Sequence, residues 1–310
     1  MPMIKVSVWC HDLSDSYLRQ VTQLGAECID FGGGDAFSDL DSVLAAQKRL
    51  RRWGLEINRV TLPDLTGTFM NDQPGAEQEL DVACKALEMF GRAGVLLARQ
   101  RFAGDIMPSS TPTYQAVHRG GYRSRGEMAH LSQWPSPSRD EIERWWSRFC
   151  LAFERLVPVA EAHGIKLAVH PSDAPYPGTP LGALGFHRVL DAFPSSQVGL
   201  LYCVGTRAEA GGSALVLDEI NHYGRKGRIF GVHLRNVRGS LATSGGFEEV
   251  LLDDGDMNMF RIVQELRKVS FDGCLNPDHV PTLEGDAGYA SHGLAYSVGY
   301  IKALLAALAA

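Results

Sequence analysis

Short apolar runs alternate with longer amphipathic segments along most of this chain. Each short run is typical of a buried β-strand, while the segments between them repeat apolar residues at helical spacing. Several of these segments end at a glycine, which suits the C-terminus of an α-helix. The predicted strands are residues 4–9, 27–31, 55–60, 94–99, 166–170, 198–203, 229–234 and 272–277.

This alternation of strands and helices predicts one fold class. Strands that are apolar almost throughout favour parallel pairing with both faces buried, and eight such β/α units can close into a (β/α)8 barrel. The alternative is a doubly wound open sheet that binds a dinucleotide. The turn after the first strand reads WCHDLSD and lacks the glycine-rich fingerprint of that fold. We therefore predict a single α/β barrel domain over residues 1–310.

The segment 100–137, after the fourth predicted strand, is too long for an ordinary connection and is rich in Arg, Gly, Ser and Pro. Connections of this length inside a domain are usually lids, binding loops or disordered segments. We predict a lid on the mouth of the barrel, with at least one of its arginines, Arg119 among them, facing the substrate. The alternatives are a solvated surface loop and a subunit contact.

The composition excludes several classes of protein. With 45% hydrophobic and 21% charged residues, the chain can bury a large core. A net charge of -6 gives no broad basic surface for nucleic acid. No apolar run approaches the roughly 20 residues that span a bilayer, and the N-terminus lacks a signal-peptide pattern, so a cytoplasmic protein is expected. The six cysteines form no C-x-x-C pair, which indicates reduced thiols.

Each of the last four predicted strands ends at, or is followed by, a potential metal ligand: His170, Cys203, His233 and Asp278. Taken singly, each is an ordinary core or turn residue. Active sites of such barrels lie at the C-terminal ends of the strands, so four candidates on consecutive strands indicate one shared site. Two imidazoles, a thiolate and a carboxylate suit a divalent transition metal, whereas Mg²⁺ and Ca²⁺ prefer oxygen ligands.

Other polar residues fall near the same mouth. Arg235 lies two residues beyond His233, so the two can share a face, and its guanidinium can bind a carboxylate. Asn236 follows it and is a further candidate for substrate binding. The first four strands end near polar residues that can bind substrate or can form structural ion pairs: His11, Asp30, Arg59 and Arg99.

Five motifs in the second half of the chain resemble the iron- or manganese-dependent D-mannonate dehydratases, which share a xylose-isomerase-like barrel. They are LAVHPSDAP, CVGT, GVHLRNV, FEEVLLDDGDMNM and PDHVPTLEGD, and the resemblance runs from about Lys166 to the end. It implies dehydration of D-mannonate to 2-keto-3-deoxygluconate with Mn²⁺ or Fe²⁺. It also implies metal binding by His170, Cys203, His233 and Asp278, and proton transfer by His279 with Tyr289.

The chain departs from the family pattern at two places, reading HPSDAP for HPDDPP and PDHV for PDHG. Two alternatives therefore stay open: an isomerase or epimerase of the same superfamily, and a catalytically silent protein that binds a sugar acid or a metal. The expected partners are a small sugar acid and further copies of the chain, with no nucleic acid and no membrane. In the dehydratase hypothesis Asp278 binds the metal and His279 acts on the substrate.

Overall fold

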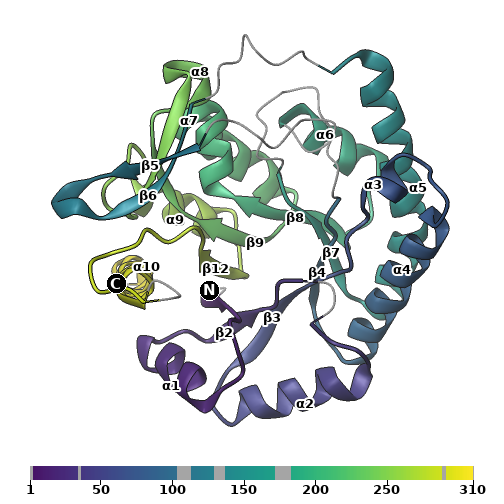
Figure 1. Cartoon of the computed structure of the whole chain (residues 1–310), viewed down its shortest axis with the longest axis horizontal. Helices are drawn as coiled ribbons and strands as arrows, with labels where there is room; N and C mark the ends of the chain where they lie inside the picture. Colours follow the sequence, from purple (N-terminus) through teal and green to yellow (C-terminus); the bar gives the residue numbers. More distant parts are fainter. Residues whose placement is uncertain are drawn as a thin grey trace.

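The computed structural model describes residues 3–33, 36–102, 113–128, 137–171, 183–287 and 291–309. Within these residues, eight parallel strands form a closed barrel in the order β1-β12-β9-β8-β7-β4-β3-β2 (Figure 1). The strands are β1 (Lys5–Trp9), β2 (Cys28–Asp30), β3 (Glu56–Thr61), β4 (Leu97–Arg99), β7 (Lys166–Val169), β8 (Val198–Cys203), β9 (Ile229–Leu234) and β12 (Cys274–Pro277). Each overlaps a predicted strand, so the predicted barrel is confirmed.

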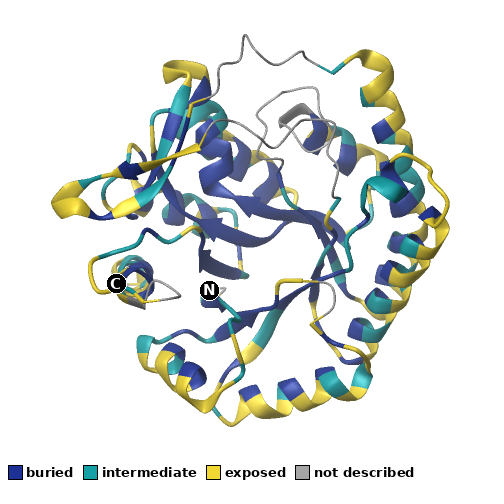
Figure 2. Cartoon of the chain, viewed as in Figure 1, coloured by how far each residue is buried: buried dark blue, intermediate teal, exposed yellow. Residues whose placement is uncertain are grey.

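Helices surround the barrel, with buried sides toward the strands and exposed sides toward solvent (Figure 2). Local sequence sets their ends. The longest, α5, begins at a capping box formed by Ser138 and Glu141 and ends at Gly164, whose φ of 64° favours glycine. The main helices are α1 (Asp15–Leu24), α2 (Leu40–Arg51), α4 (Ala76–Arg92), α5 (Arg139–His163), α6 (Ala183–Ala192), α7 (Val204–Arg225), α9 (Met259–Lys268) and α10 (Ser291–Ala309), with the short α3 (Gly67–Met70) preceding α4.

The inside of the barrel changes from apolar to polar toward its C-terminal mouth. Part of the interior is an apolar cluster of Leu97, Ala168, Leu201 and Phe230. Successive side chains of a strand alternate between its two faces, so residues two positions further on point the same way. On β4, β7 and β8 those residues are Arg99, His170 and Cys203. Strand geometry thus places three predicted site residues in the layer above this apolar cluster.

A second sheet, which the sequence analysis did not predict, stands beside the barrel (Figure 1). It is antiparallel, with the order β10-β11-β6-β5. Its elements are β5 (Thr113–Val117), the turn η1 (Arg119–Gly121), β6 (Arg123–Met128), β10 (Asn236–Arg238), α8 (Leu241–Ser244) and β11 (Gly246–Val250). The described part of the 100–137 insertion is therefore a paired hairpin, while residues 103–112 and 129–136 lie outside the described residues. The β6 sequence, RSRGEM, lacks a strand pattern. It forms a strand through its pairing with β11, which is distant in the sequence.

The last helix, α10, contains a segment that is long and apolar enough to span a membrane by length and composition alone, which the sequence analysis did not expect. This segment is His292–Ala309, and a third of it is buried. The helix contacts α1, α9, β1 and β12. Its buried residues Leu294, Val298 and Ile301 recur at helical spacing, which is the pattern of a helix packed on the barrel.

Candidate active site

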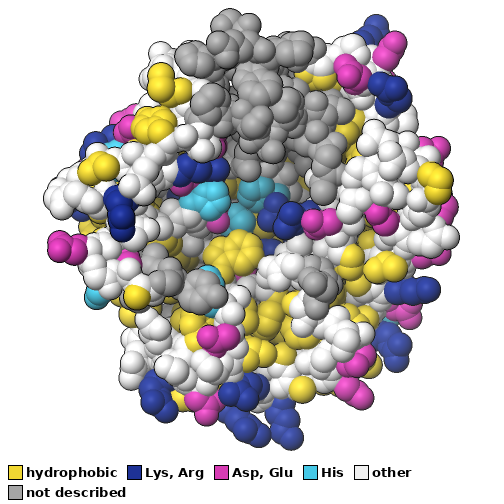
Figure 3. Space-filling model, viewed as in Figure 1, with side chains coloured by type: hydrophobic (Ala, Val, Ile, Leu, Met, Phe, Trp, Pro, Cys, Tyr) yellow, Lys and Arg dark blue, Asp and Glu magenta, His cyan; other side chains and the backbone are white. Residues whose placement is uncertain are grey.

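The residues predicted to bind a metal lie together at the mouth of the barrel. The potential ligand atoms of His170, Cys203 and His233 are all within 4.8 Å of one another. Nε2 of His170 is 3.2 Å from Nδ1 of His233, and the same Nδ1 is 3.5 Å from Oδ2 of Asp278. Figure 3 shows histidine side chains gathered in the hollow of this face. Four neighbouring strands, β7, β8, β9 and β12, therefore bring two nitrogen donors, one sulfur and one carboxylate to one place, and these four candidate ligands form the metal-ligand cluster.

The two imidazoles are in the state that binds a cation. Burial lowers the pKa of His170 well below its ordinary value and the pKa of His233 to about 3, so both rings are neutral near pH 7. Nδ1 of His170 is 2.8 Å from the carbonyl oxygen of Pro171 and donates its hydrogen there, which leaves the lone pair of Nε2 facing the cluster. Within the described part of the chain, Nε2 of His233 is buried without a hydrogen-bond partner. This donor set fits a divalent transition metal.

Neighbouring groups act on the charges of the other two candidate ligands, Cys203 and Asp278. Burial raises the pKa of the Cys203 thiol, and the guanidinium of Arg235, 3.6 Å from Sγ, opposes that rise. The backbone N–H and the hydroxyl of Thr206 also donate to Sγ, at 3.4 and 3.2 Å. Burial alone would raise the pKa of Asp278, but the neighbouring side chains of His233, His279 and Arg235 outweigh it and hold that pKa well below its usual range. The Asp278 carboxylate is therefore ionised.

Arg235 and Asn236, both predicted to bind substrate, have their polar atoms engaged inside the protein. Arg235 is 3% exposed; its guanidinium pairs with Glu209 and, at 2.6 Å, with Glu249, and its Nε is 3.5 Å from Asp278. The Asn236 side chain hydrogen-bonds the main chain of residues 237, 252 and 257. These contacts make Arg235 a partner of the metal-ligand cluster and Asn236 a support for the loop after β11.

His279 lies beside the candidate ligands, with its Nε2 3.8 Å from Oδ2 of Asp278 and its Nδ1 bonded to the second sheet. Its φ of 46° lies in the left-handed region, so the chain turns sharply directly after Asp278. Its Nδ1 is 2.6 Å from Oε1 of Glu249, and its side chain is 40% exposed. Burial would lower the pKa of His279, but Asp278 and the hydrogen bond to Glu249 outweigh it and raise the pKa. The ring lines a cavity of about 220 Å³ together with Arg123, Arg125 and the segment 280–282.

The other predicted site residues have different surroundings. His11 follows β1, half-buried against the ring of Tyr17 at 5.6 Å. Arg99 ends β4, and its charge is among the causes that lower the pKa of His170, after burial. Arg119 lies at the hairpin turn, 54% exposed, where it pairs with Asp253 at 2.8 Å. Tyr289 lies outside the described residues.

Trp9 and Glu249 lie at the mouth and were not predicted as site residues, whereas Arg59 and the insertion arginine Arg125 were among the candidates. The indole of Trp9 lies 5.6 Å from the His233 ring, and the Arg59 guanidinium lies 4.6 Å from the Trp9 ring centre. Arg125, on β6, reaches Glu249 at 2.9 Å. The only signal for Glu249 in the sequence is its place in the FEEVLLDD motif. Its contacts depend on the second sheet, whose pairing the sequence did not predict.

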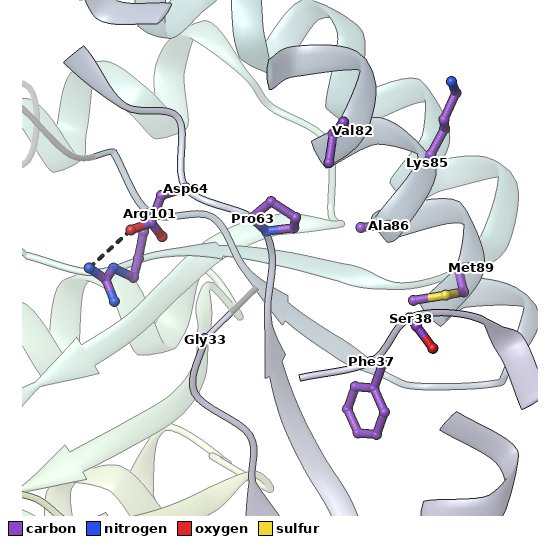
Figure 4. A pocket seen from close by; sticks show the side chains of 10 residues that line it. All are labelled: Gly33, Phe37, Ser38, Pro63, Asp64, Val82, Lys85, Ala86, Met89 and Arg101. Carbon is purple, nitrogen blue, oxygen red and sulfur yellow. Dashed lines mark ion pairs between the residues drawn. The ribbon is translucent and has the colours of Figure 1, made fainter. Parts of the chain in front are cut away.

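A larger cavity, of about 610 Å³, lies away from the metal-ligand cluster. It is bounded by the segments after β2, β3 and β4 and by one side of α4, including Phe37, Pro63 and Met89 (Figure 4). Its charged groups include an ion pair between Arg101 and Asp64 at 3.1 Å. None of the predicted metal ligands lines it.

Comparison with known proteins identifies the family. The family model described as D-mannonate dehydratase (UxuA) matches residues 132–310, which is more than half of the chain. The chain belongs to the D-mannonate dehydratase family. The resemblance found in the sequence motifs is thereby confirmed. Family membership agrees with the convergence of His170, Cys203 and His233 as a possible metal site.

Individual D-mannonate dehydratases match part of the chain. It is 29% identical over 157 residues to mannonate dehydratase 2 of Halalkalibacterium halodurans, which is 49% of this chain and 45% of that protein. It is 32% identical over 148 residues to mannonate dehydratase of Geobacillus thermodenitrificans, which is 46% of this chain and 39% of that protein. The match thus spans less than half the length of these two relatives.

Solved structures extend the likeness of fold to nearly the whole chain. The mannonate dehydratase of Streptococcus suis superposes with a TM-score of 0.84 at 21% identity, covering 98% of this chain and 95% of that one. A xylose isomerase domain protein of Alicyclobacillus acidocaldarius gives a TM-score of 0.65 at 14% identity over 99% of this chain and 100% of that one. The xylose-isomerase-like barrel expected from the motifs is therefore confirmed.

Proposed function

We propose that this protein is a metal-dependent hydro-lyase that converts D-mannonate to 2-keto-3-deoxy-D-gluconate and water. The observation that carries the proposal is the convergence of four potential ligands from four neighbouring strands, with His279 beside them, its Nε2 3.8 Å from Oδ2 of Asp278 and its ring lining an adjacent cavity. Membership of the D-mannonate dehydratase family supports the choice of sugar acid.

The metal that we propose is Mn²⁺ or Fe²⁺, held by His170, Cys203, His233 and Asp278. Two imidazoles, a thiolate and a carboxylate form a mixed set that suits such ions. When bound, the ion supplies electrostatic stabilisation for the negative charge that develops as the proton beside the substrate carboxylate is removed.

The proton transfers are assigned to this chain's own residues. Dehydration requires a base that removes the C2 proton and an acid that protonates the departing 3-hydroxyl. An imidazole can take either role near neutral pH. His279 has one nitrogen held by Glu249, so its Nε2 is the atom that exchanges a proton with the substrate. We assign binding of the sugar acid to Arg99 and His11 at the mouth of the barrel.

Incubation with D-mannonate tests the proposal. The purified protein, loaded with Mn²⁺ or Fe²⁺, should form a 2-keto-3-deoxy acid from D-mannonate faster than from other aldonic acids. The control is the same protein after chelation. Conversion of a keto sugar without loss of water would instead support an epimerase or isomerase. Metal binding with no turnover of any sugar acid would support a silent binding protein.

A further inference from the structure

The turn after β12 is held by the second sheet, although it belongs to the barrel. His279 adopts the left-handed backbone conformation that non-glycine residues rarely take, and such conformations persist only where the surroundings fix them. Three residues further on, Thr282 exchanges two backbone hydrogen bonds with Arg123 of β6, at 3.0 and 2.8 Å. The side chain of His279 is tied to Glu249 of β11. Both anchors, Arg123 and Glu249, lie in the antiparallel sheet.

Glu249 is itself fixed at this place. Its side chain is 5% exposed, and its Oε1 accepts hydrogen bonds from Arg125, at 3.1 Å, and from Arg235, at 2.6 Å. Two guanidinium groups that converge on one buried carboxylate oxygen keep it ionised and restrict its movement. An ionised carboxylate only accepts hydrogen bonds, so Nδ1 of His279, 2.6 Å away, must carry the hydrogen between them.

This contact decides which nitrogen of His279 is available for chemistry. With Nδ1 protonated and bound to Glu249, the neutral ring presents the lone pair of Nε2. Nε2 is on the side of the metal-ligand cluster, 3.8 Å from Oδ2 of Asp278. Carboxylates that accept from the far nitrogen of an imidazole fix both its tautomer and its orientation.

We propose that Glu249 is the positioning residue for His279: it fixes the Nδ1–H tautomer and the ring direction, and Arg125 and Arg235 hold it in place. The second sheet therefore contributes to the active site by orienting a residue of the barrel. The consequence for catalysis rests on the proposed dehydratase function, but the tautomer and the ring direction do not.

The test compares Glu249→Gln with Glu248→Gln. Glu248 is the adjacent residue on β11, and its carboxylate bonds Tyr114 at 2.6 Å, away from His279. Glu249→Gln should bind as much metal as the unsubstituted protein and keep its KM, while kcat falls about 10- to 100-fold. Glu249→Asp, which keeps the charge on a shorter side chain, should recover part of the loss. Glu248→Gln should behave as the unsubstituted protein.

A spectroscopic measurement tests the positioning without activity. In ¹⁵N-histidine-labelled protein, held at a pH above the pKa of His279 so that the ring is neutral, the signals of His279, assigned by their loss in His279→Gln, should report a ring protonated at Nδ1. In Glu249→Gln they should shift toward the tautomer mixture of an unconstrained ring. A dominant Nε2–H tautomer in the unsubstituted protein would overturn the proposal, even if the Glu249 variants do not fold. Unchanged signals and unchanged kcat in folded Glu249→Gln would also overturn it. Absence of dehydration in the unsubstituted protein, with the expected signals present, would refute the proposed function alone.

Discussion

At the level of single residues, Asp278 and His279 are neighbours in the chain whose side chains have different surroundings. Asp278 is 8% exposed and lies against His233 and Arg235. His279 is partly exposed and bonded to Glu249. Regular strand alternation would point Asp278 inward and His279 outward. The left-handed φ at His279 breaks that alternation, so its Nε2 stays 3.8 Å from Asp278. The two residues can therefore have separate roles.

Substitution of each residue should separate metal binding from turnover. His279→Ala should retain the metal and lose about 10²- to 10⁴-fold in kcat, as expected for an acid or base. Asp278→Ala should lose both, because a ligand and a negative charge are removed together. Metal titration of both variants, followed by assay of 2-keto-3-deoxy acid formation, measures this. Full activity of His279→Ala at saturating metal would remove His279 from the catalytic residues.

At the level of elements, the start of α7 packs against the side chain of Arg235, the residue that follows β9. Gly205, in the first turn of α7, lies so close to Arg235 that a Cβ at this position would overlap the arginine side chain. The absence of a Cβ therefore lets Arg235 reach Glu209, Glu249 and the metal-ligand cluster at once. A glycine in a helix is normally unfavourable, so this one has a packing reason.

Gly205→Ala should displace Arg235 and weaken the site. We expect a loss of about 1–3 kcal/mol in the free energy of unfolding from overpacking, together with weaker metal binding. Thermal or urea unfolding and metal titration measure the two effects. Gly299→Ala is the matched control, since no atom lies within 4 Å of a Cβ there, and alanine in α10 should stabilise by about 0.5–1 kcal/mol. Equal behaviour of the two variants would contradict the packing argument.

At the level of the whole molecule, the candidate metal site joins parts of the barrel that are distant in sequence. Its potential ligands lie at the ends of four neighbouring strands, β7, β8, β9 and β12, which are half of the eight strands of the barrel. An ion held by all four ligands is bound only when these strands are assembled. Metal binding and folding are therefore linked.

Addition of Mn²⁺ should raise the Tm, and chelation should lower it again. At a free concentration of 100 times Kd, linkage predicts about 2.7 kcal/mol of added stability. Mg²⁺ should have a smaller effect, because a thiolate and two imidazoles suit it poorly. Differential scanning calorimetry measures the shift. His170→Ala should abolish it, and an equal shift in that variant would place the stabilising ion elsewhere.

The sequence by itself determined the barrel and the candidate ligands. Apolar strands alternating with amphipathic helices leave few arrangements that bury both faces of a parallel sheet. The two-residue period of a strand then places His170 and Cys203 in one layer with Arg99. Residues at the ends of parallel strands meet at one edge whatever their separation along the chain, so the ligand cluster follows from local pattern.

Only the tertiary structure decided the second sheet and what it does to the site. The strand RSRGEM has no period of its own, and its pairing with β11 joins segments about 120 residues apart. That pairing brings Arg125 to Glu249, and Glu249 to His279. It also brings Glu249 to Arg235, so the guanidinium that the sequence predicted to bind substrate is paired inside the protein. Contacts of this kind depend on long-range pairing and on the direction of single side chains, which periodicity along the chain does not specify.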